Sequence, residues 1–116
     1  LLKTLVVRRG DGDYLFVLVP GVRAIDWAKL RGFLGVRRMT LPDAAEAREA
    51  TGYERGTITP FGATHQWPVI ADETIAAKSD VSLGAGAHGV SVTLSAAALI
   101  GTLAATVADV TKPAEG

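Results

Sequence analysis

The sequence predicts a single α/β or α+β domain with a mixed β-sheet. Strand-like and helix-like segments alternate irregularly along the chain, and a hairpin stands among the first of them. The 116 residues fit the size of one domain, and a hydrophobic fraction of 48% supports a substantial core. Because no repeat, linker or low-complexity stretch divides the chain, we expect residues 1–116 to form one unit.

The first two segments predict a β-hairpin. Residues 3–8 (KTLVVR) and 14–19 (YLFVLV) have strand-like composition, and residues 9–13 (RGDGD) between them are turn formers. The run LFVLV is apolar at odd and even positions alike, which predicts a strand covered on both faces.

Two helices and a third strand are expected next. Asp26 can cap a helix over residues 27–35, which a glycine ends. Residues 36–41 (VRRMTL) predict a strand. Residues 42–52 begin with Pro-Asp and end with Gly, which predicts a second helix.

The second half returns to strands and short helices. We expect a strand over 67–72, a turn or short helix over 73–80, two strands within 81–95 around a glycine-rich turn at 84–89, a helix over 95–104 capped by Ser95, and a last strand at 106–110.

Composition excludes several classes of function. The chain has no cysteine, which rules out disulfides, thiolate metal sites and a cysteine nucleophile. It has neither a secretory signal nor an apolar run long enough for a membrane span, so we expect a cytoplasmic protein. The net charge is zero, which argues against a protein that coats long nucleic acids. Lys and Arg concentrate in residues 1–55, which leaves room for contact with one end of a nucleic acid.

Two glycine-rich segments are the candidate binding loops. Residues 52–62 (GYERGTITPFG) can direct backbone N–H groups toward a phosphate or an oxyanion, although a plain structural turn explains them equally well. Residues 84–89 (GAGAHG) precede a predicted strand and not a helix, which excludes a dinucleotide-binding loop. His88 lies in this turn, where its ring can donate or accept a hydrogen bond.

The sequence gives little support for a metal site or for a Ser-His-Asp catalytic triad. His65, His88 and Asp72 match no compact metal-ligand spacing, and no nucleophile elbow surrounds Ser82 or Ser91. We therefore expect no metal and no cofactor.

Four segments in order (KTLVVR at 3–8, GYERGTITPFG at 52–62, VIAD at 69–72 and LGAGAHGVSVTL at 83–94) make the chain resemble the YbaK/EbsC family. These are aminoacyl-tRNA deacylase domains related to the editing insertion of bacterial prolyl-tRNA synthetase. The resemblance implies a mixed, partly barrel-like sheet flanked by helices. It also implies a further helical segment before the lysine, so we expect N-terminal residues to be missing here.

The resemblance also implies the site residues. Lys3 and His88 would be catalytic, and the substrate-binding loops would comprise Gly56, Thr57, Ile58, Thr59, Pro60, Gly62, Gly84, Ala85 and Gly86. Further candidates for the pocket wall are Asp72 and the apolar or aromatic residues Tyr53, Ile58, Phe61 and Trp67, with core packing as the default for each of these four. Arg8, Arg9, Arg37 and Arg38 are candidates for tRNA phosphate contacts, with a solvated surface as the alternative.

The function implied is hydrolysis, in trans, of the ester that joins a wrong amino acid to tRNA, often tRNA-Pro carrying Cys or Ala. The expected partners are the tRNA acceptor end and a prolyl-tRNA or other aminoacyl-tRNA synthetase, and the oligomeric state is left open. Two alternatives stand beside it: a non-catalytic module that binds tRNA or a synthetase, and a small-molecule hydrolase or ligand-binding protein that reuses the pocket.

Overall fold

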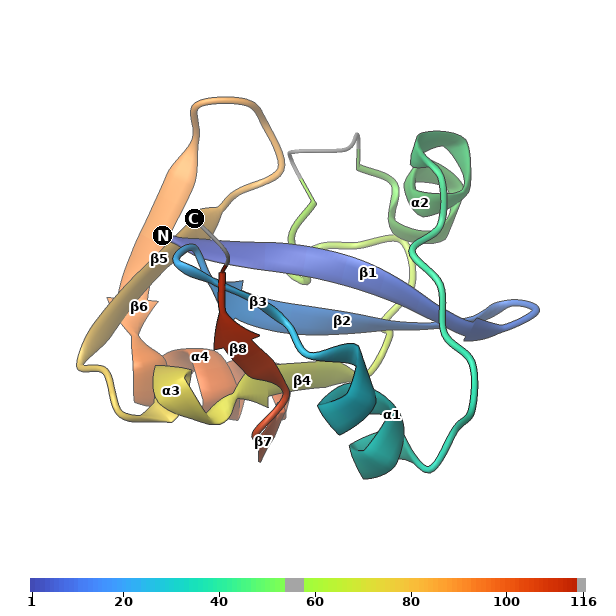
Figure 1. The fold of residues 1–116 in the computed structure, drawn as a ribbon. Coiled ribbons are helices and arrows are strands. Elements are labelled where there is room, and N and C mark those ends of the chain that lie inside the picture. The colour runs from blue at the N-terminus through green and yellow to red at the C-terminus, as the bar shows by residue number, and fades with distance from the viewer. Residues whose placement is uncertain (54–57, 115–116) are drawn as a thin grey trace.

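The computed structural model describes residues 1–53 and 58–114, which form a curled mixed sheet with helices packed around it (Figure 1). The strands are β1 (Leu2–Gly10), β2 (Asp13–Pro20), β3 (Arg23–Ile25), β4 (Val69–Asp72), β5 (Asp80–Gly84), β6 (Ser91–Ser95), β7 (Thr106–Ala108) and β8 (Thr111–Pro113). The helices are α1 (Trp27–Leu34), α2 (Ala44–Thr51), α3 (Glu73–Ala76) and α4 (Ala96–Leu103). Within the described residues, none of these helices has the length and apolar character of a membrane span.

The large sheet has the strand order β6-β5-β1-β2-β4-β7. β1 and β2 form the predicted antiparallel hairpin, β5 and β6 form a second one, and the pairs β1–β5, β2–β4 and β4–β7 are parallel. β3 and β8 form a small antiparallel ribbon in front of the sheet (Figure 1). The prediction of a mixed, partly barrel-like sheet flanked by helices is confirmed.

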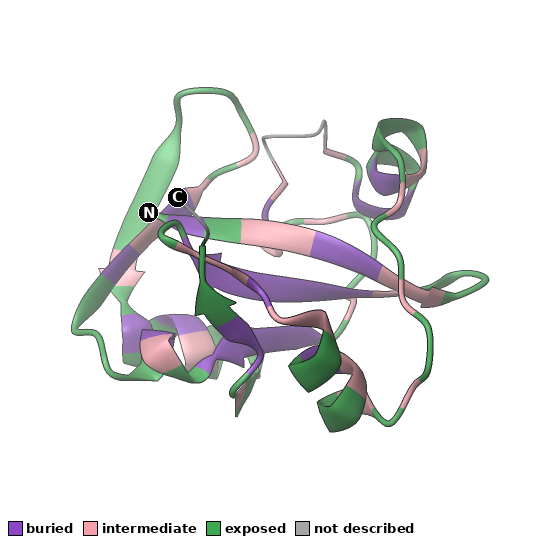
Figure 2. Cartoon of the chain, in the orientation of Figure 1, coloured by how far each residue is buried: buried purple, intermediate pink, exposed green. Residues whose placement is uncertain are grey.

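β2 is buried on both faces, as its unbroken apolar run predicts (Figure 2). Phe16 and Leu18 belong to the core cluster that contains α3 and α4. Leu15, Val17 and Val19 point to the opposite cluster, which contains buried residues of α1 and β3. Successive side chains of a strand alternate between faces, so one strand links the two halves of the core.

The predicted helix boundaries are confirmed by their caps. The Asp26 side chain accepts a hydrogen bond from the Lys29 N–H, and the Asp43 side chain accepts one from the Glu46 N–H. Gly35 ends α1 at φ 69°, a left-handed conformation that glycine adopts without steric penalty.

The predicted strand over residues 36–41 is wrong. Only Thr40 pairs there, through two backbone hydrogen bonds with Arg8 of 2.9 and 3.1 Å. The segment crosses one end of β1 and does not run along it, and Leu41 is left 53% exposed. Local composition alone predicted a strand, but apart from Thr40 the segment has no neighbouring strand to pair with.

The ribbon of β3 and β8 was not predicted, and the last predicted strand, over 106–110, ends at Ala108. Three-residue strands are too short to show a periodic pattern. After Ala108 the chain turns Val110 into the core, where its N–H donates to the Asp72 carboxylate at 3.1 Å.

Asp72 is a structural carboxylate and not a free one. It is 1% exposed, caps α3 by accepting from the Thr74 N–H at 3.1 Å, and also accepts from the Thr74 hydroxyl. Burial alone would raise the pKa of Asp72, but the hydrogen bonds from Thr74 and Val110 outweigh burial and hold that pKa below its ordinary value.

We expect Asp72→Asn to lower the free energy of unfolding by about 1–3 kcal/mol at pH 7, because one buried carboxylate oxygen with a bonded donor is lost. The depressed folded pKa means that the carboxylate stabilises the fold above about pH 4 and that this contribution disappears as the pH falls through the folded pKa. Urea unfolding between pH 2.5 and pH 7 should therefore show the difference between wild type and variant shrinking in acid. Asp109→Asn, at an exposed ion pair with Lys29, is the control and should change little.

Candidate functional site

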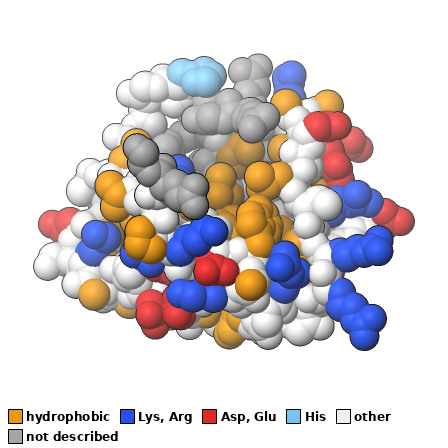
Figure 3. Space-filling model, in the orientation of Figure 1, with side chains coloured by type: hydrophobic (Ala, Val, Ile, Leu, Met, Phe, Trp, Pro, Cys, Tyr) orange, Lys and Arg blue, Asp and Glu red, His pale blue; other side chains and the backbone are white. Residues whose placement is uncertain are grey.

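A cavity of about 400 Å³ opens beside β1. It brings together Lys3, Ile58 and Gly84, one from each of three segments that the sequence singled out. The full lining in the described residues is Leu1, Leu2, Lys3, Thr4, Leu5, Val6, Leu41, Pro42, Ala44, Ala47, Ile58 and Gly84. We call the cavity with this lining the β1 pocket. Hydrophobic side chains gather in the middle of the face of the molecule that Figure 3 shows.

The β1 pocket is mostly apolar and contains one unusual hydroxyl. Thr4 Oγ1 is buried and has no hydrogen-bond partner among the described residues. Thr4 shares a strand face with Leu2 and Val6, which are both in the core cluster behind the pocket. A buried hydroxyl without a partner is unfavourable by about 1–3 kcal/mol, so this group stands out as one that a ligand could satisfy.

Lys3 contributes to the pocket wall, but its ammonium is turned elsewhere. The Lys3 Nζ donates to the Arg23 backbone carbonyl at 2.8 Å. Lys3 and Thr4 are consecutive in β1, so their side chains leave the sheet on opposite faces. The charged group therefore lies at the rim, beside β3, and not among the apolar lining.

The loop that follows residues 54–57 is ordered by its own contacts. The predicted loop residues Gly56 and Thr57 lie outside the described residues. Thr59 is 1% exposed, and its hydroxyl accepts a hydrogen bond from the Phe61 N–H at 3.4 Å. Ile58 and Phe61 pack against the core cluster, and Pro60 is half-buried beside them. Of this part of the loop, Ile58 alone lines the β1 pocket.

Tyr53 joins the two candidate loops. Its hydroxyl donates to the Phe61 carbonyl at 2.7 Å. Its ring lies so close to Gly86 that a Cβ built there would be 2.8 Å from Tyr53 Cε1. Gly86 is at φ 91°, and a Cβ built at Gly62, which is at φ 69°, would be 3.1 Å from the Tyr53 hydroxyl. Both glycines therefore leave space for the Tyr53 side chain. The sequence did not reveal this reason for a glycine at either position.

The glycine-rich turn after β5 carries His88 away from the pocket wall. Ala85 N–H donates to the Val90 carbonyl at 3.0 Å, and Val90 N–H donates to the Ala87 carbonyl at 3.2 Å. His88 is exposed at the tip of this turn and is absent from the described lining of the pocket. Ala85 is likewise exposed, and Gly84 alone of this segment lines the pocket.

The four candidate phosphate-binding arginines divide into two kinds. Arg8 pairs with Asp11 and, at 3.4 Å, with Glu46, while Arg9 pairs with Asp13 at 3.0 Å. Arg37 and Arg38 are exposed, and in the described part of the chain no carboxylate pairs with either. Their charges are therefore easier to redirect to a phosphate than those of Arg8 and Arg9.

The remaining candidates have structural surroundings. Asp72 is the cap described above and does not line the β1 pocket. Trp67 Nε1 donates to the Ala50 carbonyl at 2.9 Å, and the ring of His65 stacks on Trp67 with 5.1 Å between centroids. Residues 1–53 and 58–114 contain no cluster of three His, Cys, Asp or Glu side chains that could hold a metal ion.

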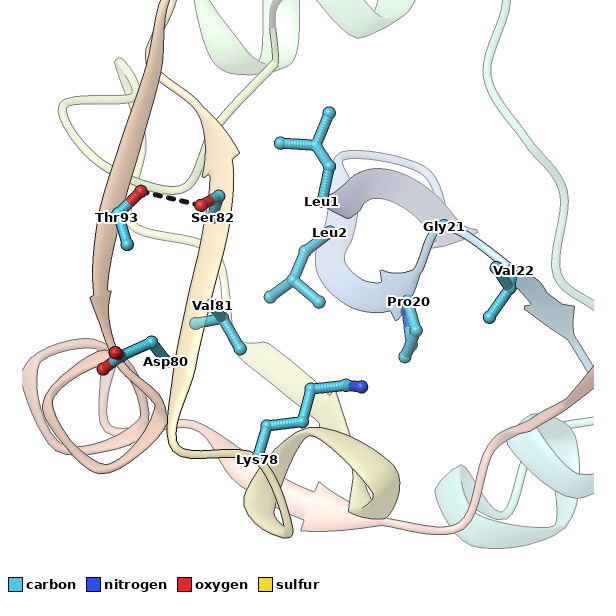
Figure 4. Close-up of a pocket in the computed structure, with 10 residues that line it drawn as sticks. All are labelled: Leu1, Leu2, Pro20, Gly21, Val22, Lys78, Asp80, Val81, Ser82 and Thr93. Atoms are coloured by element: carbon cyan, nitrogen blue, oxygen red, sulfur yellow. Dashed lines mark hydrogen bonds between the residues drawn. The ribbon is translucent and has the colours of Figure 1, made fainter.

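A second cavity, of about 350 Å³, lies between the start of β1, the end of β2 and the hairpin of β5 and β6 (Figure 4). Its lining includes Lys78 and Asp80, and Ser82 Oγ is 2.7 Å from Thr93 Oγ1. Ser82 is thus bonded to a threonine and has no histidine beside it in the cavity lining. None of the predicted site residues that the structure describes lines this cavity.

Sequence reasoning missed Thr4 and the wall that α2 provides. Leu41, Pro42, Ala44 and Ala47 reach the pocket because residues 36–43 carry the chain across the end of β1. Thr4 is a polar residue next to the apolar residues of KTLVVR. A polar side chain in a predicted buried strand was the signal that could have identified it. The α2 wall depends on a tertiary contact that no local pattern marks.

We expect Gly86→Ala to lower the free energy of unfolding by about 2–4 kcal/mol, because a Cβ would meet the Tyr53 ring and the backbone is left-handed. Gly89→Ala is the matched control, with φ 74° and no atom within 4 Å of the added Cβ, and should lower it by about 1–2 kcal/mol. Urea unfolding measures both. Equal effects would show that the Tyr53 contact has no steric role.

We expect Thr4→Val to raise the free energy of unfolding by about 1 kcal/mol, because it replaces an unpartnered buried hydroxyl with a methyl group of similar volume. Thr51→Val is the contrasting variant, because the Thr51 hydroxyl donates to the Ala47 carbonyl at 2.8 Å and accepts from the Tyr53 N–H at 3.1 Å. That variant should lose about 1–2 kcal/mol. Destabilisation by Thr4→Val would mean that Thr4 Oγ1 has a partner in solution.

Three comparisons with known proteins found relatives of this chain. A family model described as an aminoacyl-tRNA editing domain matches residues 1–102. A proline–tRNA ligase of Xanthomonas campestris is 33% identical over 92 residues, which are 79% of this chain and 16% of the ligase. EbsC of Enterococcus faecalis, named as a candidate Cys-tRNA(Pro)/Cys-tRNA(Cys) deacylase, is 26% identical over 100 residues, which are 86% of this chain and 61% of EbsC.

The fold has a solved counterpart. A crystal structure described as a candidate trans-editing enzyme for prolyl tRNA synthetase superposes with a TM-score of 0.89 and 25% identity, over 96% of this chain and 69% of that one. The chain thus spans a small part of the ligase and about two-thirds of the free-standing relatives. The fold and the family match, which extends over residues 1–102 and so includes all three pocket-forming segments, lead to one conclusion: this chain belongs to the aminoacyl-tRNA editing domain family.

Proposed function

We propose that this domain hydrolyses the ester bond of mischarged aminoacyl-tRNA in trans. The observation that carries the proposal is the convergence of Lys3, Ile58 and Gly84 on one apolar cavity. These residues come from three of the four segments on which the family resemblance rests. A cavity of about 400 Å³ is large enough for a small aminoacyl group together with part of the terminal ribose.

The hydrolysis of an aminoacyl ester needs no covalent nucleophile from the protein. A water oxygen forms a bond to the ester carbonyl carbon, and the bond from that carbon to the ribose oxygen then breaks. One water proton passes to the leaving ribose oxygen, the other is released to the solvent, and the amino acid departs as its carboxylate. The described lining has no carboxylate or imidazole to act as general base. The main contribution of the site is therefore to hold the ester and stabilise its oxyanion with N–H groups.

Lys3 fits a role at the rim better than one inside the cavity. Its ammonium bonds the Arg23 carbonyl on the far face of β1 from Thr4. From this position it is suited to the phosphate of the terminal nucleotide, which an ammonium attracts as a point charge. Exposed Arg37 and Arg38 are suited to phosphates further along the acceptor stem. His88, exposed at the tip of the glycine-rich turn, is suited to the part of the terminal nucleotide that lies outside the cavity.

The lining favours a small, weakly polar amino-acid side chain. Ala and Cys meet this requirement, because an apolar wall offers no partner for a charged or strongly polar group. A cysteinyl ester also brings its own thiol to a site whose described lining lacks a base. We therefore propose tRNA-Pro carrying Ala or Cys as the substrate, with a synthetase as partner and the cytoplasm as the place of action.

The test is single-turnover deacylation of Ala-, Cys-, Ser- and Thr-charged tRNA, including mischarged tRNA-Pro. We expect Ala or Cys esters on tRNA-Pro to be cleaved fastest. Lys3→Ala should reduce the rate at least tenfold, because a charge at the terminal phosphate is lost. Lys78→Ala removes an exposed lysine outside the β1 pocket and should leave the rate unchanged.

If no charged tRNA is cleaved, the domain is a binding module. Its affinity for charged tRNA and for a synthetase, measured in the same preparation, would then describe its function. If Lys78→Ala is as damaging as Lys3→Ala, the assigned role of Lys3 is wrong.

A further inference from the structure

The backbone groups of β1 alternate between two edges, and the structure shows which residues face which edge. Pro20 lies opposite Leu2 and has no N–H to donate, so this pair cannot exchange ladder hydrogen bonds. Arg8 exchanges two hydrogen bonds with Thr40, on the edge away from β2. Both observations place the N–H and C=O groups of the even-numbered residues of β1 on the edge away from β2.

Among the described residues, the neighbours of β1 along that edge lie at its two ends. β5 pairs with β1 through Leu2 and Leu83, and β5 ends at Gly84. The bridge from Thr40 comes at Arg8. Between these points, the C=O of Thr4 and the N–H and C=O of Val6 have no backbone partner among the described residues. Both residues line the β1 pocket.

An unpaired strand edge is a ready template for another chain segment. In parallel pairing, a residue of one strand donates its N–H to a carbonyl of the neighbouring strand. Its own carbonyl accepts from the N–H that lies two residues further along that neighbouring strand. On β1, the Thr4 carbonyl and the Val6 N–H are such a pair. A ligand that fits them carries a hydrogen-bond donor and an acceptor at the spacing found in a single amino-acid residue.

An aminoacyl ester has this pattern in its α-ammonium and its carbonyl oxygen. We propose that the open edge of β1 holds the aminoacyl group of the substrate, with its α-ammonium on the Thr4 carbonyl and its ester carbonyl on the Val6 N–H. This inference rests on the proposed deacylase function and specifies how that site reads its substrate. The Val6 N–H then supplies a donor to the oxyanion.

This arrangement separates two tasks. Backbone groups recognise the part common to all amino acids, and the apolar wall selects the side chain. The unpartnered Thr4 hydroxyl lies at the same point of the strand. An α-hydroxyacyl or N-acylated group lacks the charged donor and should be held poorly.

The binding test uses an adenosine whose 3′ oxygen is replaced by nitrogen, which carries an uncleavable alanyl amide. Backbone ¹⁵N spectra of the chain should show a large shift of the Val6 N–H and slower hydrogen exchange at that group. The matched propionyl amide lacks the α-amine and should bind at least about tenfold more weakly, because a charge-assisted hydrogen bond is lost. Equal affinity for the two amides, absence of binding, or shifts confined to the second cavity would each overturn the proposal.

The kinetic test removes one backbone donor. Replacing Val6 with its α-hydroxy analogue converts the amide N–H to an ester oxygen and keeps the side chain. We expect deacylation to slow about a hundredfold. The same replacement at Val7, whose N–H faces β2 opposite Leu15 and which is outside the described lining of the β1 pocket, is the control and should affect stability more than rate. If the Val6 variant deacylates as fast as the wild type, the strand-edge role is refuted and the proposed deacylase function stands. If the wild type itself is inactive, the deacylase function is refuted, and the binding test alone decides whether the strand edge holds an aminoacyl group.

Discussion

The register of β1 against β2 is the constraint on which the rest of the structure depends. It places Leu2 opposite Pro20 and Val6 opposite Phe16, so that one face of β1 joins the core cluster of α3 and α4. The same register directs alternate backbone groups of β1 to the edge beside the pocket. A slip by one residue would move Thr4 to the opposite face and place Lys3 toward the core, with loss of the site and the core together.

The β1 pocket therefore results from the way the neighbouring segments meet the two ends of β1. β5 leaves β1 after one parallel pair, and residues 36–43 cross the other end of β1 to begin α2. Tyr53 donates to the Phe61 carbonyl and lies against Gly86, so it links the two segments that supply Ile58 and Gly84 to the pocket. An apolar lining suits a reaction whose substrate is already an activated ester.

Much of the fold was predictable because its signals are local. The hairpin, the doubly buried β2 and the caps at Asp26 and Asp43 follow from patterns within a few residues. The pairing of Arg8 with Thr40, the ribbon of β3 and β8, and the wall from α2 depend on distant segments, and the sequence alone did not reveal them. The resemblance brought Lys3, Ile58 and Gly84 to attention, but the direction of the Lys3 ammonium and the exposure of His88 required the structure.

The central claim is that the β1 pocket receives the aminoacyl end of tRNA. It is tested most directly by mapping ¹⁵N chemical-shift changes caused by an acceptor-stem minihelix that ends in an uncleavable alanyl amide, with the uncharged minihelix as reference. The account predicts that the charged minihelix adds shifts at Thr4, Val6, Ile58 and Gly84. Added shifts at Val22, Lys78 and Ser82, which line the second cavity, or none beyond those of the uncharged minihelix, would contradict it.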